Sequence, residues 1–271
     1  MPEIIEKFTL SKTNIQETSE DAYFISDNYI AVIDGATSKN SKPVNGKTGG
    51  QLIKDSILMS LSLLSGTEDS DKAISFIHNN IVKNLPEEKY GNVSASAVIY
   101  SAMKNEIWLV GDCQIMINSK LISKTHKIDE LLSELRILAM DLLKEEGFGF
   151  DDFTEKDVSR EMIMPFLEKQ KYLANKKGKY GYFCFNNVPL KDIEYSDIVE
   201  VFALNENSEV VLASDGYPFL KETLKESEEE LLKVLKEDPL CCTLNPSTKG
   251  VVKGNRSFDD RTYLRFKTGH K

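Results

Sequence analysis

The sequence predicts an α+β fold in which an antiparallel sheet carries helices on its faces. Several short β-rich runs are separated by only two to four residues. Connections this short join antiparallel strands, because a parallel crossover needs about a dozen residues or more. The segments with helical periodicity form blocks that are separate from the strand pairs, which is typical of the α+β class.

The strands are expected where β-branched and aromatic residues cluster between turn residues. These runs are residues 22–26, 29–33, 93–102, 106–110, 114–118, 198–204, 210–213 and 261–266. Apolar residues recur with the 3.6-residue helical period in residues 49–64, 71–85, 126–146, 155–175 and 221–237. We expect Pro165 to kink or interrupt the fourth of these helices, because proline has no backbone N–H to donate.

Composition indicates a single globular domain over residues 1–271. Hydrophobic residues make up 41% and charged residues 28% of the chain, and no long Pro/Gly/Ser linker divides it. The first ten residues carry three charges, and no run approaches the ~20 apolar residues of a membrane span. A cytoplasmic protein without a secretory signal or membrane segment is therefore expected.

Charge and cysteine content exclude some partners and cofactors. The chain has 34 Lys and Arg against 43 Asp and Glu, a net charge of −9, which argues against nucleic acid or an anionic membrane as the main partner. The four cysteines form no Cys-x-x-Cys pair. We therefore expect buried thiols in a reducing compartment rather than disulfides or a zinc site. The sequence indicates no oligomeric state.

Acidic residues recur at the ends of the expected strands. Three apolar runs finish at an aspartate beside a glycine, and two acidic pairs precede further strands: Asp34-Gly35, Gly111-Asp112, Asp215-Gly216, Glu20-Asp21 and Asp259-Asp260. Any one of them alone could be a turn, because Asp-Gly favours turns. Together they predict that acids from five segments meet at one end of a sheet, where Mg²⁺ or Mn²⁺ would find oxygen ligands.

Two other phosphate motifs fail at a required residue. Asn45-Gly-Lys-Thr48 resembles the end of a P-loop, but Ser41 replaces the glycine that should stand five residues before Gly46. Asp34-Gly35 also resembles the start of the haloacid-dehalogenase phosphatases, in which the nucleophilic aspartate would have to be Val32.

The order of the acidic motifs from Glu20 to Asp259-Asp260-Arg-Thr262 resembles the metal-dependent type 2C (PPM) serine/threonine protein phosphatases. The resemblance covers residues 20–266. It implies a sandwich of two antiparallel β-sheets flanked by α-helices, with a variable flap at residues 123–194 beside the active site. It also implies hydrolysis of phosphoserine and phosphothreonine in a protein substrate by a metal-activated water.

The resemblance assigns roles to individual acids. Asp34 would bridge two Mn²⁺ or Mg²⁺ ions, one of them bound also by the Gly35 carbonyl, and Asp215 and Asp259 would be the other direct ligands. These three aspartates would be the catalytic group. Glu20 and Asp21 would contact metal-bound water or support the site, and Asp112 with Asp215 would form a weaker third metal site. Asp260 stands where many members have asparagine.

Other positions depart from the family pattern. Gln16 replaces an arginine that grips phosphate, Ala36 follows Asp34-Gly35 where eukaryotic members have a histidine, and Phe219 replaces an aspartate of the third site. The candidates for the phosphate contact are Gln16 itself and the cations Lys39, Lys42, Lys47 and Arg256; the alternative for the insertion at residues 37–48 is a solvated loop. His126 is a candidate replacement acid, or else a surface or helix-capping residue.

Two rival functions stay open at this point. The departures at Gln16 and Ala36 favour a pseudophosphatase that acts as a binding or regulatory module, whereas the retained Asp34, Asp215 and Asp259 favour the enzyme. The same metal centre could also hydrolyse a small phosphorylated metabolite.

Overall fold

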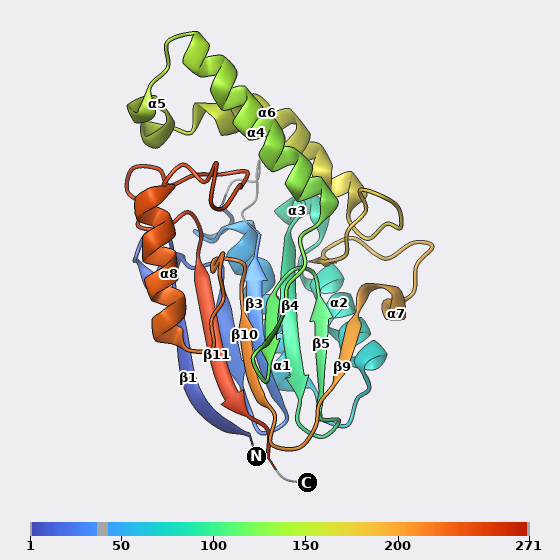
Figure 1. The fold of residues 1–271 in the computed structure, drawn as a ribbon. Coiled ribbons are helices and arrows are strands. Elements are labelled where there is room, and N and C mark those ends of the chain that lie inside the picture. Colours follow the sequence, from blue (N-terminus) through green and yellow to red (C-terminus); the bar gives the residue numbers. More distant parts are fainter. Residues whose placement is uncertain (1, 37–42, 270–271) are drawn as a thin grey trace.

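The computed structural model describes residues 2–36 and 43–269, which form two antiparallel β-sheets packed face to face (Figure 1). One sheet has five strands in the order β1 (Glu3–Leu10), β11 (Arg261–Lys267), β10 (Glu209–Ala213), β6 (Gln114–Ile117) and β7 (Lys120–Ile122). The other has the order β2 (Ala22–Ile25), β3 (Tyr29–Gly35), β4 (Ser94–Ser101), β5 (Glu106–Val110) and β9 (Glu200–Ala203), with β8 (Phe185–Asn186) also paired to β4. The predicted antiparallel pairing is confirmed.

One hydrophobic core lies between the two sheets, and a larger one lies between the six-stranded sheet and the helices on its outer face. In β3, Ile30 and Val32 point toward the five-stranded sheet, whereas Tyr29, Ala31 and Ile33 pack on the opposite face. Side chains alternate between the faces of a strand, so a strand that is covered on both sides has an uninterrupted apolar sequence. This explains why the run before Asp34 contains no polar residue.

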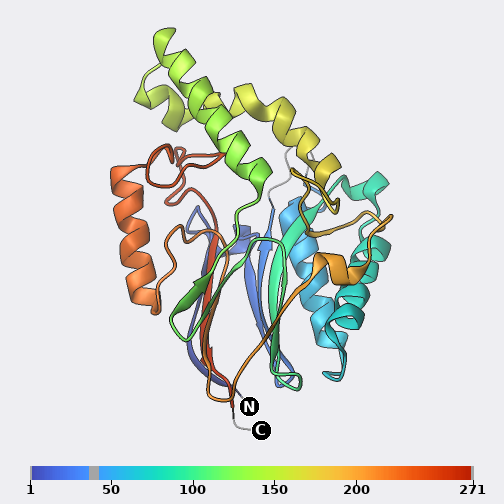
Figure 2. The same cartoon turned by 45° about the vertical axis from the view of Figure 1, so that its right-hand side comes forward.

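Helices cover the outer faces of both sheets (Figure 2). On the six-stranded sheet lie α1 (Gly49–Leu63) and α2 (Ser70–Asn84), with the short α3 (Glu87–Tyr90) and α7 (Tyr195–Ile198) nearby. On the five-stranded sheet lies α8 (Leu224–Glu237), which buries Leu231 against Tyr217 and Tyr263. The layers agree with the fold that the sequence resemblance implies.

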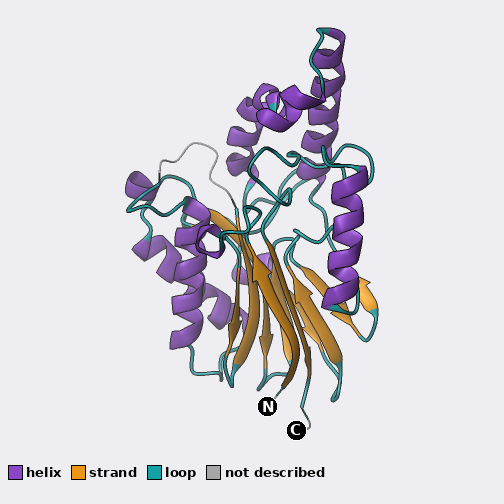
Figure 3. Ribbon diagram, turned by 90° about the vertical axis from the view of Figure 1, so that its left-hand side faces the viewer, coloured by secondary structure: helices purple, strands orange, loops and turns teal. Residues whose placement is uncertain are grey.

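A helical flap stands over one end of the sandwich, at the end opposite the chain termini (Figures 1 and 3). It contains α4 (Lys127–Glu145), α5 (Phe150–Glu155), α6 (Val158–Lys169) and the 3₁₀ helix η2 (Gln170–Leu173), all within the flap predicted at 123–194. Its small core joins α4 to α6 through Leu132, Ala139, Ile163 and Leu167. No helix in the described part of the chain has the length and apolarity to cross a membrane.

The elements differ in places from those that the sequence predicts, and two differences have a clear cause. Strand β1 was not predicted, because its residues are only partly buried or exposed and its charged residues interrupt the apolar pattern. The predicted helix over 155–175 is shorter, and Pro165 lies inside α6 without ending it. Pro165 and Glu161, whose carbonyl loses its helical partner, are both exposed, so water can replace the missing hydrogen bond. Three of the four predicted buried thiols are buried, Cys242 is half-buried, and all four are free.

Candidate metal centre

Strand pairing brings the acidic segments together at the end of the sandwich beneath the flap. Ala22, next to Asp21, pairs with Ile33, next to Asp34. In the other sheet Ala213 pairs with Tyr263, so the end of β10 lies beside the start of β11. The backbone N–H of Asp215 donates to Asp34 Oδ2 at 3.4 Å and links the two sheets at this point. The acids of the five motifs lie at one end of the sandwich and come from both sheets, whereas the strand pattern predicted the end of a single sheet.

The acids open into a cleft of about 680 Å³ between the sandwich and the flap. Five of the predicted site residues line this cleft: Asp34, Gly35, Asp112, Asp215 and Asp259. Ala36 also lines it, in the place where the family histidine is missing. The cleft is thus bounded on one side by strand ends and on the other by flap residues such as Tyr182 and Arg160.

Glu20 and Asp21 form a buried layer beneath the cleft. Thr48, the N-cap of α1, donates its hydroxyl hydrogen to Glu20 Oε1 at 2.6 Å, and the N–H of Gly35 donates to the Glu20 carbonyl at 3.2 Å. A Cβ on Gly50 would lie 2.6 Å from Glu20 Oε1, so only glycine fits there. The segment that resembles a P-loop therefore serves to place Glu20.

The buried acids resist ionisation in the metal-free protein. Burial raises the pKa of Asp21 and of Asp34 well above the usual range, and neighbouring carboxylates raise both further. Although the Asp215 side chain is exposed to the cleft, desolvation by the surrounding protein and the charge of Asp259 raise its pKa to about 7. Asp21 Oδ2 is buried without a hydrogen-bond partner among the described residues. Several carboxylates lie close together here with few cationic side chains to neutralise them. Such a group of oxygen donors fits divalent cations such as Mg²⁺ or Mn²⁺.

Two lysines that sequence reasoning missed lie at the acidic group. Lys12 Nζ is 3.6 Å from Asp259 Oδ1 and 3.7 Å from Glu20 Oε2, and Lys249 forms an ion pair with Asp259. Although burial opposes ionisation of Asp259, these two ammonium groups lower its pKa. Lys12 and Asp260 are 248 residues apart, so no local sequence pattern could predict that Lys12 contacts the Asp259-Asp260 segment.

The hydrogen bonds of Asp260 explain why a carboxylate stands at this position. Its Oδ1 accepts the N–H of Lys12 at 2.8 Å and its Oδ2 accepts the N–H of Glu20 at 2.7 Å. Both oxygens accept, which a carboxylate does and an asparagine amide does not. Asp260 thereby fixes the segment that carries Glu20 and Asp21.

The residues that were predicted to contact phosphate do not lie together in the cleft. Lys47 is exposed and lies 2.5 Å from Asp55 Oδ2, and Arg256 and Gln16 are exposed; none of the three lines the cleft. Lys39 and Lys42 lie outside the described residues. Phe219 is also exposed, at 42%. Lys249, in contrast, lines the cleft beside Asp259.

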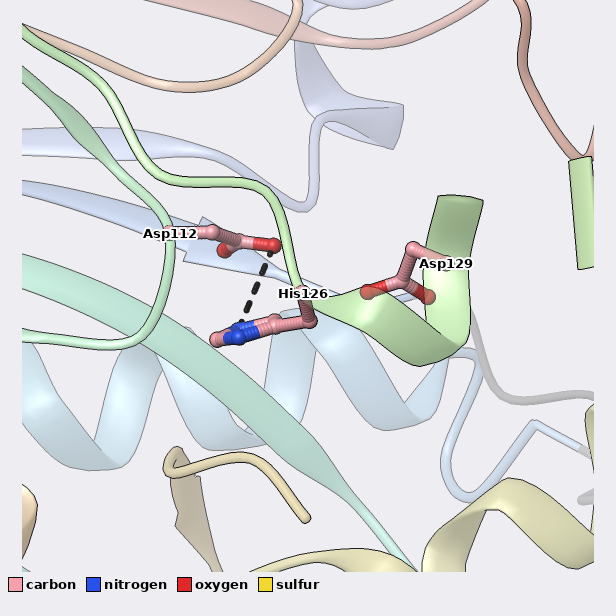
Figure 4. Close-up of side chains that lie close together, drawn as sticks. All are labelled: Asp112, His126 and Asp129. Carbon is pink, nitrogen blue, oxygen red and sulfur yellow. Dashed lines mark ion pairs between the residues drawn. The ribbon is translucent and has the colours of Figure 1, made fainter. Parts of the chain in front are cut away.

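His126 is neither a surface residue nor a cap. It occupies the N-cap position of α4 but makes no side-chain capping hydrogen bond, and its side chain is 9% exposed. Its ring lies at the cleft, 5.3 Å from the Tyr182 ring between centroids. Its surroundings include Asp112 and Asp129 (Figure 4).

Solved structures of phosphatases are similar to this chain over nearly its whole length. A bacterial serine phosphatase is 12% identical and covers 98% of this chain and 99% of its own, with a TM-score of 0.50. A variant described by the same name is 13% identical, covers 98% of both chains and has a TM-score of 0.51. The serine/threonine phosphatase PstP/Ppp of Mycobacterium tuberculosis is 13% identical, covers 98% and 100%, and has a TM-score of 0.48.

No protein-family model matches the sequence, and no curated protein matches it significantly. Identity of 12–13% to a solved structure demonstrates a shared fold and nothing finer. The two-sheet sandwich flanked by helices, with the acidic motifs at one end, is the arrangement that the sequence resemblance implied. The chain therefore has the fold of the metal-dependent type 2C (PPM) serine/threonine phosphatases.

Proposed function

We propose that this chain is a metal-dependent phosphatase that hydrolyses phosphoserine and phosphothreonine in proteins. The observation that carries the proposal is the group of carboxylates that line the cleft and raise one another's pKa. Such a group is stable in its ionised form when divalent cations neutralise it. The fold shared with a bacterial serine phosphatase agrees with this function.

The residues of the centre fit two Mn²⁺ or Mg²⁺ ions. Asp34, the carbonyl of Gly35, Asp215 and Asp259 would hold them at the cleft, with the layer of Glu20 and Asp21 behind. When bound, such ions supply an activated water for in-line attack on phosphorus and neutralise charge on the phosphoryl oxygens. Asp260 and Thr48 keep Glu20 in place through hydrogen bonds of 2.7 and 2.6 Å.

Lys249 is the cation that we assign to the substrate phosphate. It lines the cleft, its side chain is 27% exposed, and its partner Asp259 is one of the proposed metal ligands. Once Asp259 faces a metal ion, the ammonium of Lys249 can contact phosphate oxygens as a point charge. It would thus substitute for the arginine that Gln16 replaces.

The phosphorylated protein as substrate follows from the family resemblance, and a cytoplasmic location and a signalling role stay predictions. So do the single domain over residues 1–271 and the phosphate contacts of Gln16, Lys39, Lys42, Lys47 and Arg256.

The test is hydrolysis of a phosphothreonine peptide and of para-nitrophenyl phosphate with Mn²⁺, with Mg²⁺ and with EDTA. Asp215→Asn should abolish the metal-dependent turnover. The matched control is Asp27→Asn, since Asp27 is exposed in the β2–β3 turn at the opposite end of the sandwich. Turnover of para-nitrophenyl phosphate alone would contradict the protein substrate and favour a small metabolite. Metal binding without any turnover would contradict the enzyme and favour the pseudophosphatase.

A further inference from the structure

A histidine and two aspartates meet where the flap joins the sandwich. Asp112 follows β5, His126 directly precedes α4, and Asp129 lies in the first turn of α4 (Figure 4). One potential metal-binding atom of each residue lies within 4.8 Å of those of the other two. Donors on one ion, bound at about 2.0–2.2 Å each, lie at most about 4 Å apart, so small side-chain rotations would bring all three onto one cation.

The His126 ring has no hydrogen bond that explains its burial. Its Nε2 is 3.8 Å from Asp112 Oδ2, which is too long for a hydrogen bond. Neither ring nitrogen makes a hydrogen bond to another residue in the described parts of the chain, although only 9% of the side chain is exposed. In Figure 4 the ring extends beneath the Asp112 carboxylate, with which it forms only this long ion pair, so an ion bound by both residues would lie between them.

Hydrogen bonds from neighbouring side chains orient the carboxylates of Asp112 and Asp129. Ser96 donates its hydroxyl hydrogen to Asp112 Oδ1 at 2.5 Å, and Gln170 Nε2 donates to Asp129 Oδ1 at 2.6 Å. Gly111 allows the first contact, because a Cβ there would lie 2.1 Å from Ser96 Oγ. Outer hydrogen bonds of this kind are what holds metal-ligating side chains in position.

We propose that Asp112, His126 and Asp129 bind one divalent transition-metal ion of the Zn²⁺ or Mn²⁺ type, in addition to the two ions of the proposed function. An imidazole nitrogen with two carboxylates suits such ions better than Mg²⁺, which prefers oxygen donors alone. The family resemblance pairs Asp112 with Asp215, whereas this site takes its other ligands from the flap. The ion would therefore connect the start of α4 to the segment that follows β5. Its binding does not depend on phosphatase activity.

The test observes His126 directly. The chain has only three histidines, so ¹⁵N-histidine labelling gives a simple NMR spectrum in which His126→Gln identifies the His126 signals. Zn²⁺ alone is added to the full chain in EDTA-free buffer. The ¹⁵N signal of one His126 ring nitrogen should move as it does on metal ligation, and the change should saturate as the Zn²⁺ concentration rises. The signals of His78 serve as the internal control, because that ring is hydrogen-bonded to Tyr195 and Asn186 behind the six-stranded sheet.

Matched variants separate this site from the acidic group. Asp129→Asn should abolish the His126 shift, and Gln170→Ala should weaken Zn²⁺ binding about tenfold, as loss of an orienting hydrogen bond does. The double variant Asp34→Asn/Asp259→Asn should keep the shift, because it alters only the other metal centre. An unshifted His126 at saturating Zn²⁺ would overturn the proposal, and so would a shift that survives Asp129→Asn but disappears in the double variant. Turnover is not measured, so failure of the proposed function would leave these outcomes unchanged.

Discussion

The acidic end of the sandwich and the flap face each other across one cleft, but different interactions hold them in place. The acids follow from strand pairing and from close backbone contacts at glycines such as Gly35 and Gly50. The flap depends on a few side chains that reach the segment 238–253, between α8 and β11. The comparison teaches that backbone register places the negative charges of the site, whereas long-range side-chain contacts place its cation.

Arg136 of α4 is the centre of the flap's attachment. Its side chain is fully buried, its Nη2 lies 2.8 Å from Asp157 Oδ2, and its Nη1 donates to the carbonyls of Leu240 and Ser247 at 2.9 and 3.1 Å. The N–H of Gly250 donates to the same carboxylate at 3.1 Å. Lys249 therefore reaches Asp259 from a loop that the flap positions.

The largest effect should follow from breaking this attachment. Arg136→Met leaves Asp157 as a buried carboxylate without its ion pair, and we expect a loss of about 3–5 kcal/mol in the free energy of unfolding. Urea unfolding followed by circular dichroism measures it. The control is Lys144→Met on the same helix, whose pair with Asp141 is exposed and should contribute less than about 1 kcal/mol. Equal losses in the two variants would show that the flap does not depend on Arg136.

The sandwich end can be tested with two glycines of nearly equal backbone angle. Gly111 has φ 99° and Gly147, just after α4, has φ 98°, but a Cβ would meet Ser96 Oγ at 2.1 Å in the first case and nothing within 4 Å in the second. Both alanine variants carry the strain of a positive φ. Gly111→Ala should cost about 1–3 kcal/mol more, because Ser96 must move. Thermal unfolding of the two variants checks this, and equal costs would refute close packing at Gly111.

The same contrast decides how much the sequence could predict. Asp34 and Asp112 stand at the ends of β3 and β5 in the six-stranded sheet, and antiparallel pairing, which the short connections between strands indicate, is enough to place them at the same end. Asp215 follows β10 in the other sheet and joins them only because the two sheets pack face to face. The antiparallel strand pairs were therefore predictable, as were the main helices. Strand β1 was not, because an edge strand with partly exposed faces has no strong apolar pattern.

The positive charges of the site had no local signal. Lys249 reaches Asp259 only because Arg136 and Asp157 hold the intervening loop, and Lys12 reaches it through tertiary packing. Searching near the acids in sequence led instead to Arg256, which is exposed. The sequence indicated His126 as a replacement acid or else as a surface or helix-capping residue, because its burial beside Asp129 depends on the start of α4 and on the turn after β5, which no local pattern shows.

The next prediction concerns the cation that the flap positions. Lys249→Gln should raise KM for a phosphothreonine peptide about tenfold with little change in kcat, since a charge-assisted contact to phosphate is lost. Lys253→Gln is the control, because Lys253 is exposed in the same loop and pairs with Glu155 of the flap. Steady-state kinetics at saturating Mn²⁺ distinguishes the two. An unchanged KM in Lys249→Gln would show that a residue other than Lys249 contacts the substrate phosphate.

The smallest effect concerns the pH dependence of the metal-free protein. The folded-state pKa of Asp215 is raised to about 7, so between about pH 4 and 7 the folded protein keeps a proton that the unfolded chain has lost. Stability should therefore fall as pH rises through this window. Because the Asp215 side chain is exposed to the cleft and water screens it, we expect about 1 kcal/mol between pH 5 and 8.

His78 acts in the opposite direction in the same pH range, since burial lowers its pKa and makes its protonation unfavourable in the folded state. The measurement is accordingly the difference between the wild type and Asp215→Asn, in which the contribution of His78 cancels. In EDTA, the melting temperature of the wild type relative to the variant should decrease from pH 5 to pH 8. Saturating Mn²⁺ should remove that decrease, because a bound cation favours the ionised carboxylate. A difference independent of pH in EDTA would mean that the acids of the sandwich end do not repel one another, and the contrast with the flap would then lose its electrostatic basis.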